Sequence, residues 1–477
     1  MLKIHNSLTG EKQEFEPLRP GEVRMYVCGM TNYDYIHVGH ARMLTVFDLI
    51  QRYLRSKGYK VTYVRNVTDI DDKIIERAAA NGENWADLAR RFTVAMHEDC
   101  ATLGLQAPDL EPRATEYIGP IIAMTQTLID KGYAYVAADG DVMYSVRKFA
   151  AYGKLSGKKI DDLRSGSRVQ VDDAKLDPLD FVLWKRAKPG EPSWSSPWGE
   201  GRPGWHIECS TMAMKYLGET LDIHTGGVDL AFPHHENEIA QSEGATGHPF
   251  VKLWLHAEHL IIDGQKMSKS LGNFYTLRDL FAKSYKPSTI RFLLLSVPYR
   301  RQLNFTEDGL TQARNSVERL RNFMARLKTE QFAAGSNPEI HALIEKAEQE
   351  FDAGLADDVN TAIALAAVFD LVRDINTAMD RGAFLQQDAP RAVAAMEQFD
   401  AILALFVDDD EDKLQKLGFG ASKARLASEQ VDALIEERQA AKGRRDFKRA
   451  DAIRQQLSDS GIIVEDTKDG TVRWKYK

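Results

Sequence analysis

A strand–helix–strand pattern near the start of the chain constrains the fold most strongly. Residues 22–29 are typical of a short β-strand that ends at Gly29. From Gly39 to Gly58 apolar side chains recur every three or four residues, which predicts an amphipathic helix. Residues 60–67 then alternate as a second strand does. Strands joined through a helical crossover run parallel, so the pattern predicts an α/β domain.

A second pattern of the same kind follows later in the chain. Residues 221–224 predict a strand, residues 234–243 a helix, and residues 250–260 mostly strand. We interpret residues 112–200, which separate the two halves, as an insertion. It is expected to contain a helix, a polar stretch and an ordered loop, at residues 118–131, 152–168 and 189–203.

The character of the sequence changes after residue 305. Three amphipathic helical patterns predict a helical bundle, at residues 311–330, 337–355 and 360–379. The acidic run 408–412 predicts a linker. Further helix is expected at 428–460, and the short runs 462–464 and 471–474 could pair as a hairpin. The expected domains are therefore 1–111 with 201–305, the insertion 112–200, the bundle 306–407 and a small mixed α/β domain at 408–477.

Composition excludes some classes of protein. Hydrophobic residues make up 43% of the chain and charged residues 28%, which is typical of a folded protein with a sizeable core. The net charge of −8 argues against a surface coated in basic groups, although a local basic patch is enough to contact nucleic acid. Three cysteines are a poor disulfide framework, and we find no signal-like or membrane-spanning segment. We therefore expect a cytoplasmic protein.

The motif His37-Val38-Gly39-His40 lies where the first helix is expected to begin. A helix N-terminus offers unpaired N–H groups and a partial positive charge, so anions bind there. The imidazoles can donate hydrogen bonds to phosphate oxygens, and Gly39 permits a close approach of the backbone. Taken alone, the pattern leaves open that both histidines are ordinary surface residues beside a turn.

The second motif, Lys266-Met267-Ser268-Lys269-Ser270, follows a turn-forming Asp-Gly pair. Two mobile lysines could neutralise the charge that develops on a leaving pyrophosphate. A solvated basic loop is the alternative. The occurrence of one motif in each half of an α/β domain is more specific than either motif alone.

Cys28, Cys209, His234 and Glu238 are candidate metal ligands. His234 and Glu238 are four residues apart on an expected helix, so they share one face. Two thiolates, one imidazole and one carboxylate would suit tetrahedral zinc. The four residues are scattered over some two hundred positions, however, and buried cysteines without a metal remain an alternative by spacing alone.

The two phosphate motifs resemble the HIGH and KMSKS signatures of class I aminoacyl-tRNA synthetases. The resemblance implies a Rossmann-like catalytic domain with an inserted connective-peptide domain, on which an amino acid is activated by ATP, with magnesium expected. It also implies that His37 and His40 bind ATP phosphates in the transition state. Lys266 and Lys269 would stabilise that state from a mobile loop.

Three further segments and the tail narrow the resemblance to the cysteinyl-tRNA synthetase family. The segments are residues 26–31 (YVCGMT), 204–210 (GWHIECS) and 232–238 (FPHHENE), and the tail runs from residue 449 to residue 467. The likeness implies ligation of L-cysteine to tRNA(Cys) through cysteinyl-adenylate, with release of AMP and pyrophosphate. It implies one zinc ion per chain, held by the matching Cys28, Cys209, His234 and Glu238, which binds the substrate thiol.

The same resemblance implies roles for other residues. Gly39, Gly226, Gly227, Asp229 and Lys269 would bind ATP, although Thr225 stands where the family often has glycine. The expected contacts of the substrate cysteine are Gly29, Thr31, Thr68 and Trp205. Cys100 has no place in this scheme, and we interpret it as a structural thiol.

The resemblance also implies a tRNA partner. Residues 438–454 carry seven Lys/Arg and two acidic residues on an expected helix, which a solvated helix face would also explain. In the family the C-terminal region reads the anticodon, where unpaired bases are accessible, and the bundle would contact the tRNA stem. The chain is expected to act as a monomer.

Two rival functions differ in what they require of the sequence. A ligase that passes cysteine to a small amino sugar would share the catalytic domain and the zinc site, but it would not need the residues after 408. A catalytically inactive RNA-binding relative would not need intact phosphate motifs together with four candidate metal ligands. Both rivals are therefore disfavoured by the sequence.

Overall fold

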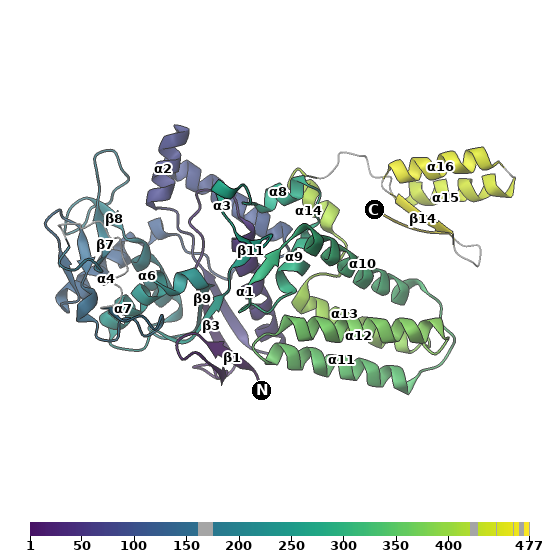
Figure 1. Cartoon of the computed structure of the whole chain (residues 1–477), viewed down its shortest axis with the longest axis horizontal. Coiled ribbons are helices and arrows are strands. Elements are labelled where there is room, and N and C mark those ends of the chain that lie inside the picture. Colours follow the sequence, from purple (N-terminus) through teal and green to yellow (C-terminus); the bar gives the residue numbers. More distant parts are fainter. Residues whose placement is uncertain (161–174, 420–427, 445, 461, 467–471, 477) are drawn as a thin grey trace. The chain divides into compact units, whose positions relative to one another are not determined.

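The structure, a computed structural model, describes residues 1–160, 175–419, 428–444, 446–460, 462–466 and 472–476 of the chain (Figure 1). Two compact units are present, Met1–Leu417 and Gly418–Lys477, called the first and second unit below. Part of the polar stretch expected at residues 152–168 lies outside the described residues. Within the described ranges, no helix combines the length and apolarity needed to cross a membrane.

A four-stranded parallel sheet forms the centre of the first unit, with the strand order β10-β9-β3-β4. Helix α1 connects β3 to β4, and helix α7 connects β9 to β10, so both predicted strand–helix–strand patterns are confirmed. The bounds are β3 Glu22–Val27, α1 Val38–Ser56, β4 Lys60–Arg65, β9 Leu221–Gly227, α7 His234–Thr246 and β10 Val251–Ala257.

Strands β3 and β9 are neighbours in the sheet (Figure 1). From β3 the chain continues through α1 to β4 on one side, and from β9 it continues through α7 to β10 on the other side. Open parallel sheets bind ligands at such a reversal, just beyond the carboxyl ends of the strands. Cys28 and His37 follow β3, whereas Asp229 and His234 follow β9. The topology therefore gathers both halves of the expected site at one edge of the sheet.

A buried ion pair between Asp48 and Arg291 attaches α1 to a neighbouring helix. Asp48 accepts hydrogen bonds from Arg52 Nε at 2.8 Å and from Arg291 Nη2 at 2.7 Å. Arg291 lies on α9 (Pro287–Leu295), and its Nε donates to the carbonyl of Leu403 at 2.7 Å. The helix that begins beside His37 is therefore fixed in position.

The insertion between the halves contains the predicted helix, α4 Ile118–Asp130. It also contains an antiparallel sheet that was not predicted, with strands β5 Ala134–Val136, β6 Val142–Tyr144, β7 Phe181–Arg186 and β8 Gly201–Pro203. The expected loop at residues 189–203 is therefore wrong at its end, because residues 201–203 pair with β7. Apolar residues of α4 and this sheet join the same core as β3, α6 and α7.

Smaller elements complete the catalytic part of the first unit. Helix α6 packs on β3 and β9 of the central sheet, and α2 packs on α3 (Figure 1). A three-stranded sheet has the strand order β12-β11-β13. Their bounds, with those of the N-terminal hairpin and α8, are β1 Lys3–Asn6, β2 Glu11–Glu14, α2 Asp72–Asn81, α3 Trp85–Thr102, α6 Trp205–Leu217, β11 Leu260–Ile262, β12 Gln265–Lys266, α8 Leu277–Ala282 and β13 Leu303–Phe305.

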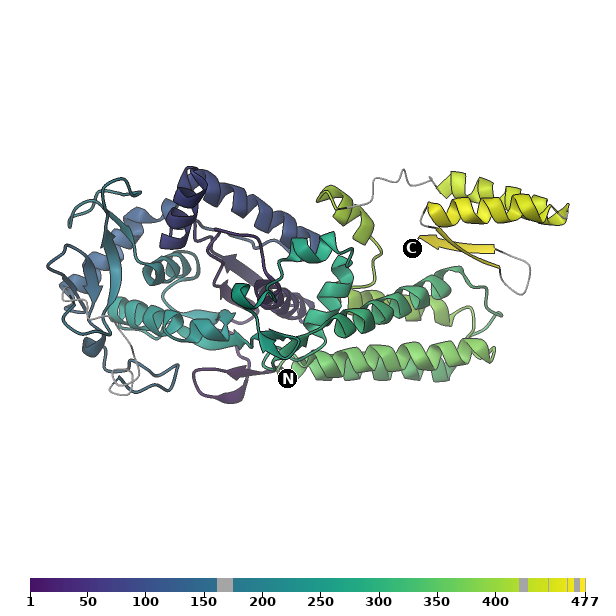
Figure 2. The same ribbon diagram turned by 45° about the horizontal axis from the view of Figure 1, so that its top comes forward.

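The helical bundle contains the three predicted helices and one more, and Figure 2 shows these green helices side by side. They are α10 Glu307–Thr329, α11 Pro338–Ala356, α12 Thr361–Asp380 and α13 Asp388–Leu403. The acidic run 408–412, expected as a linker, instead begins helix α14 (Asp410–Lys416). Asp410 is buried, because Arg321 Nη1 lies 2.7 Å from its Oδ2 and the Ser288 backbone N–H donates to its Oδ1 at 2.9 Å.

The second unit consists of two helices and a hairpin around its own core. The elements are α15 Ser428–Gly443, α16 Phe447–Asp459, β14 Ile462–Asp466 and β15 Val472–Tyr476. The predicted hairpin is confirmed, with Val464 opposite Trp474, while Thr471 lies outside the described residues. Its core is apolar and is built from Val431, Ile435, Ile453, Leu457 and Ile462.

Candidate active site

The four candidate metal ligands come together from three elements. Cys28 follows β3, Cys209 lies on α6, and His234 and Glu238 lie one turn apart on α7. One ligand atom from each lies within 4.8 Å of the others, and all four residues are buried. Cys28 Sγ is 3.8 Å from Cys209 Sγ and 3.5 Å from Glu238 Oε1, which is 3.0 Å from His234 Nε2.

The charges of this group suit a bound cation. A hydrogen bond from the Cys28 thiol lowers the pKa of Cys209 to about 6. Burial opposes ionisation of Glu238, but His224 and His234 outweigh it and lower the pKa of Glu238 to about 2. Burial also opposes protonation of His234, yet Glu238 and Cys209 raise its pKa to about 10. A proton on His234 thus offsets two negative groups, and a metal ion would replace that proton.

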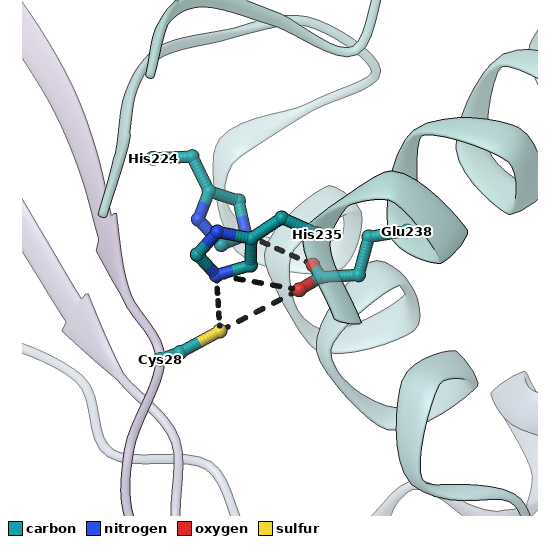
Figure 3. A group of neighbouring side chains, drawn as sticks. All are labelled: Cys28, His224, His235 and Glu238. Atoms are coloured by element: carbon teal, nitrogen blue, oxygen red, sulfur yellow. Dashed lines mark hydrogen bonds and ion pairs between the residues drawn. The ribbon is translucent and has the colours of Figure 1, made fainter. Parts of the chain in front are cut away.

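A second, overlapping set of potential ligands was missed by sequence reasoning. It keeps Cys28 and Glu238 and adds His224 and His235 (Figure 3). His224 Nε2 lies 2.9 Å from Glu238 Oε2, and His235 Nε2 lies 3.4 Å from Cys28 Sγ. The sequence offered two signals, a histidine in the middle of β9 and a second histidine beside His234, but neither shows which way its ring points.

The donor atoms distinguish the two sets. The set with Cys209 and His234 offers two sulfurs, one nitrogen and one oxygen, whereas the set with His224 and His235 offers one sulfur. Two thiolates favour zinc, which takes soft sulfur ligands in tetrahedral sites. His224 would then be a hydrogen-bond partner of the ligand Glu238 and not a ligand itself, since metal-bound carboxylates are usually hydrogen-bonded to a neighbouring side chain. His234 has such a partner too, because its Nδ1 lies 2.9 Å from His206 Nδ1.

The first phosphate motif caps helix α1. His37 Nδ1 accepts a hydrogen bond from the His40 backbone N–H at 3.1 Å, and the two rings stack with centroids 3.5 Å apart. Burial lowers the pKa of His37 to about 4 and that of His40 well below its usual value. Because Nδ1 of the neutral His37 ring accepts, its proton lies on Nε2, which remains available as a donor.

The structure brings the second motif against the first. Val38 donates its backbone N–H to the Tyr275 carbonyl at 3.0 Å, and a side chain at Gly39 would lie 3.6 Å from Met267 Cε. Lys269 Nζ pairs with Asp34 Oδ2 at 2.9 Å, on the loop just before His37. Lys266 ends β12 and is exposed; its ammonium group has no contact with either motif histidine in the structure.

The expected ribose loop lies on the β9 side of the same edge. Gly226 and Gly227 end β9, and the exposed Asp229 follows in a short 3-10 helix. Asp229 is close enough to His37 to raise its pKa, against the larger effect of burial. A side chain at Gly226 would lie 2.8 Å from His235 Cε1, so the protein's own packing already requires glycine there.

Of the residues expected to contact cysteine, Trp205 lies directly against the metal-ligand set. Trp205 packs on the ring of His234, with centroids 4.2 Å apart. Thr31 pairs with Thr68 in a parallel bridge between the segments that follow β3 and β4. The Gly29 backbone N–H donates to Asn66 Oδ1 at 2.7 Å, and a side chain at Gly29 would collide with the Asn66 carbonyl.

Cys100 lies outside this group, as expected. It is buried on α3, where Arg65 Nη1 lies 3.7 Å from its sulfur, and burial raises the pKa of its thiol. The third cysteine therefore has a packing role beside an ion pair of Arg65 and Glu111.

The basic segment at residues 438–454 spans the end of α15 and most of α16. Arg438 is buried, and Arg449 pairs with Glu437 at 2.8 Å, so neither is a free surface cation. Lys442, Arg444, Lys448 and Arg454 are exposed, while Arg445 lies outside the described residues.

Comparisons with known proteins agree with this architecture. Residues 14–315 match the family model described as the tRNA synthetases class I (C) catalytic domain. Residues 350–407 match the DALR domain, and residues 425–474 match the cysteinyl-tRNA ligase anticodon binding domain. A Mycobacterium tuberculosis methionyl-tRNA synthetase in complex with methionyl-adenylate superposes with a TM-score of 0.60 at 16% identity, covering 84% of this chain and 94% of that one, which shows the shared fold.

Sequence relatives extend over the whole chain. A cysteine–tRNA ligase of Halorhodospira halophila is 52% identical over 475 residues, covering 100% of this chain and 99% of the relative. A cysteine–tRNA ligase of Ralstonia nicotianae is 51% identical over 477 residues, covering 99% of each. With full-length identity of this order and a catalytic-domain match over most of the first unit, the chain belongs to the cysteine–tRNA ligase family of class I aminoacyl-tRNA synthetases.

Proposed function

We propose that this chain joins L-cysteine to tRNA(Cys) with ATP in two steps. A carboxylate oxygen of cysteine attacks the α-phosphorus of ATP, the bond to the bridging oxygen breaks, and cysteinyl-adenylate and pyrophosphate form. A 3′-terminal ribose hydroxyl of the tRNA then attacks the cysteinyl carbonyl carbon, and AMP leaves. The observation that carries the proposal is the convergence of Cys28, Cys209, His234 and Glu238 at the sheet edge where His37 also lies, in a chain of this family.

Selection of cysteine is assigned to the buried ligand set. Zinc held by Cys28, Cys209, His234 and Glu238 would bind a thiolate far better than the harder hydroxyl of serine, a discrimination that an apolar pocket does not provide. Trp205 packs on His234 and would cover the substrate from one side. Since both thiols and the carboxylate are buried, water is largely excluded from this position.

Adenylate formation is assigned to the motifs at the two strand ends. The N-terminus of α1, Gly39 and the Nε2–H group of neutral His37 would bind phosphate oxygens, with His40 stacked behind His37. Lys269 would leave Asp34 to neutralise the charge that builds up on the departing pyrophosphate, with Lys266 and magnesium as further positive charges. Gly226, Gly227 and Asp229 would receive the ribose. No general base is needed, because positioning and electrostatics account for the chemistry.

The tRNA is assigned to the parts of the chain beyond the catalytic domain. The second unit would read the anticodon, and its exposed cations Lys442, Arg444, Lys448 and Arg454 are suited to phosphate contacts. The bundle would support the tRNA stem. We further propose that the enzyme acts as a monomer in the cytoplasm, and its sparse, reduced cysteines fit a reducing compartment.

Cysteine-dependent exchange of pyrophosphate into ATP tests activation separately from transfer. The chain should exchange with cysteine, exchange very little with serine, and charge tRNA(Cys). A truncation after Leu417 should keep exchange but lose most charging, because α14 belongs to the first unit and the second unit has its own core. Unchanged charging by the truncated chain would refute the anticodon role, and the absence of exchange would refute the enzymatic proposal.

A further inference from the structure

Glu208 is a buried carboxyl group that has no role in the proposed metal binding, adenylate formation or transfer to tRNA. It lies on α6 directly before Cys209, and only 1% of its surface is exposed. Its Oε2 atom is buried and has no hydrogen-bond partner among the described residues. An unpartnered buried carboxyl oxygen is costly, so such a group is expected to have a partner that arrives from outside.

Most of the protein's own charges near Glu208 are already engaged elsewhere. Asp69 accepts hydrogen bonds from the backbone and side chain of Thr115, at 3.0 and 2.7 Å, and Asp71 accepts from the Lys73 backbone N–H at 2.9 Å. Glu208 lines a cleft of about 260 Å³ together with three cations, Lys175, Lys185 and Arg202, of which Lys185 and Arg202 pair with Asp72. Among the described residues no cation pairs with Glu208, so its position can take a positively charged ligand.

Thr68 specifies what kind of group can bind beside Glu208. Its hydroxyl accepts a hydrogen bond from Asn66 Nδ2 at 3.2 Å and acts as a donor toward the Glu208 carboxylate. A hydroxyl has one donor and two lone pairs. The lone pair that remains on Thr68 can only accept, so its ligand must be a hydrogen-bond donor.

The cleft adjoins the expected position of the substrate thiol. Trp205 lines the cleft and packs on His234, and Glu208 is next to Cys209 in the chain. Neither set of close metal-ligating atoms includes Glu208, which disfavours a metal ion as the missing partner. An ammonium group provides both a positive charge and several donors.

We infer that Glu208, with the Thr68 hydroxyl, binds the α-ammonium group of the substrate cysteine. The inference rests on the proposed function, in which the thiol of the same molecule is held by the metal-ligand set. Two anchors, one for sulfur and one for the ammonium group, would set the direction in which the carboxylate faces ATP. Glu208 would thereby distinguish cysteine from thiols that lack an amino group.

The test compares Glu208→Gln, which preserves shape, with the wild-type enzyme. Cysteine is titrated as the substrate of pyrophosphate exchange, and two analogues are titrated as inhibitors. Cysteamine keeps the ammonium group, whereas 3-mercaptopropionate lacks it. Loss of a hydrogen bond to a charged group predicts that cysteine and cysteamine bind about 10- to 100-fold more weakly. Binding of 3-mercaptopropionate and the KM for ATP should stay within about twofold.

Thr68→Val should show the same selective loss, to a smaller extent. Asp388→Asn, which changes a buried carboxyl group in the bundle, controls for general destabilisation and should leave all three affinities unchanged. Equal weakening of cysteine and 3-mercaptopropionate would overturn the inference, as would unchanged cysteine binding with slower transfer to tRNA. Failure of the proposed function would instead appear in the wild-type chain, as the absence of cysteine-dependent exchange.

Discussion

Replacing each cysteine by serine in turn identifies which ligand set holds the metal. Cys28 belongs to both overlapping sets, Cys209 to only one, and Cys100 to neither. If Cys28, Cys209, His234 and Glu238 hold zinc, Cys28→Ser and Cys209→Ser must both weaken metal binding. Cys100→Ser must not, although it also changes a buried thiol.

The size of the loss follows from the number and state of the ligands. Structural zinc sites with four ligands bind with an apparent free energy of about 10–16 kcal/mol, so each ligand accounts for about 3 kcal/mol. The pKa of Cys209 is about 6, so its sulfur is mostly thiolate at neutral pH, whereas a serine hydroxyl stays protonated. Cys209→Ser should therefore weaken zinc binding by about two orders of magnitude.

Two measurements check this prediction. Competition with a chelator gives the zinc affinity of each variant. Cobalt(II) in place of zinc gives a sulfur-to-metal charge-transfer absorption that grows with the number of bound thiolates, so Cys209→Ser should reduce it without abolishing it. The preference for cysteine over serine in pyrophosphate exchange should fall in parallel.

His235→Asn separates the two ligand sets. As an outer neighbour of Cys28, His235 should matter less than Cys209 does for metal affinity. Retention of full metal affinity and of the cobalt absorption by Cys209→Ser, together with loss of metal from His235→Asn, would refute our assignment. The set shown in Figure 3 would then be the correct one.

Three further predictions address other parts of the chain. Lys269→Ala should slow pyrophosphate exchange about 100- to 1,000-fold with little change in cysteine affinity, and equal loss of both would contradict its assigned role. With a pKa of about 4, His37 is neutral above that pH, so the exchange rate should show no His37 inflection between pH 6 and 8; an inflection there that His37→Asn removes would show otherwise. Asp410→Asn should lower the free energy of unfolding in urea by about 3 kcal/mol because Arg321 loses a buried partner, whereas the more exposed Asp409→Asn should cost under about 1 kcal/mol.

Much of the central sheet and its helices could be predicted, because the periodicity of these segments matches the structure that they adopt in the folded chain. The α1 segment has helical periodicity and packs as a helix, and the alternating residues of β4 pair with β3 in a parallel sheet. The strands of the insertion were not predicted, since β5, β6 and β8 have three residues each and β6 pairs with the distant β7. Such short runs carry too little periodicity to be distinguished from loop.

The acidic run at 408–412 shows the opposite failure. A cluster of acidic residues usually indicates a solvated segment, and the composition of this run gives no sign that one of its carboxyl groups is buried. Asp410 is nevertheless buried, because Arg321 and Ser288, each about a hundred residues away in the chain, pair with it. Charge compensation of this kind depends on contacts between residues that are far apart in the sequence.

The kind of chemistry could be predicted from residue types and their order along the chain. The two phosphate motifs and the segments around Cys28, Cys209 and His234 are short stretches of sequence. Each can be recognised from its residue types without knowing the fold. Which side chains meet follows from the folded chain alone. The reversal between β3 and β9 brings Cys28 and His234 to one sheet edge, and α6 adds Cys209. The same packing adds the unpredicted His224 and His235, and it buries one carboxylate oxygen of Glu208 without a hydrogen-bond partner among the described residues. Distances between atoms from separate elements are set by packing and not by spacing along the chain.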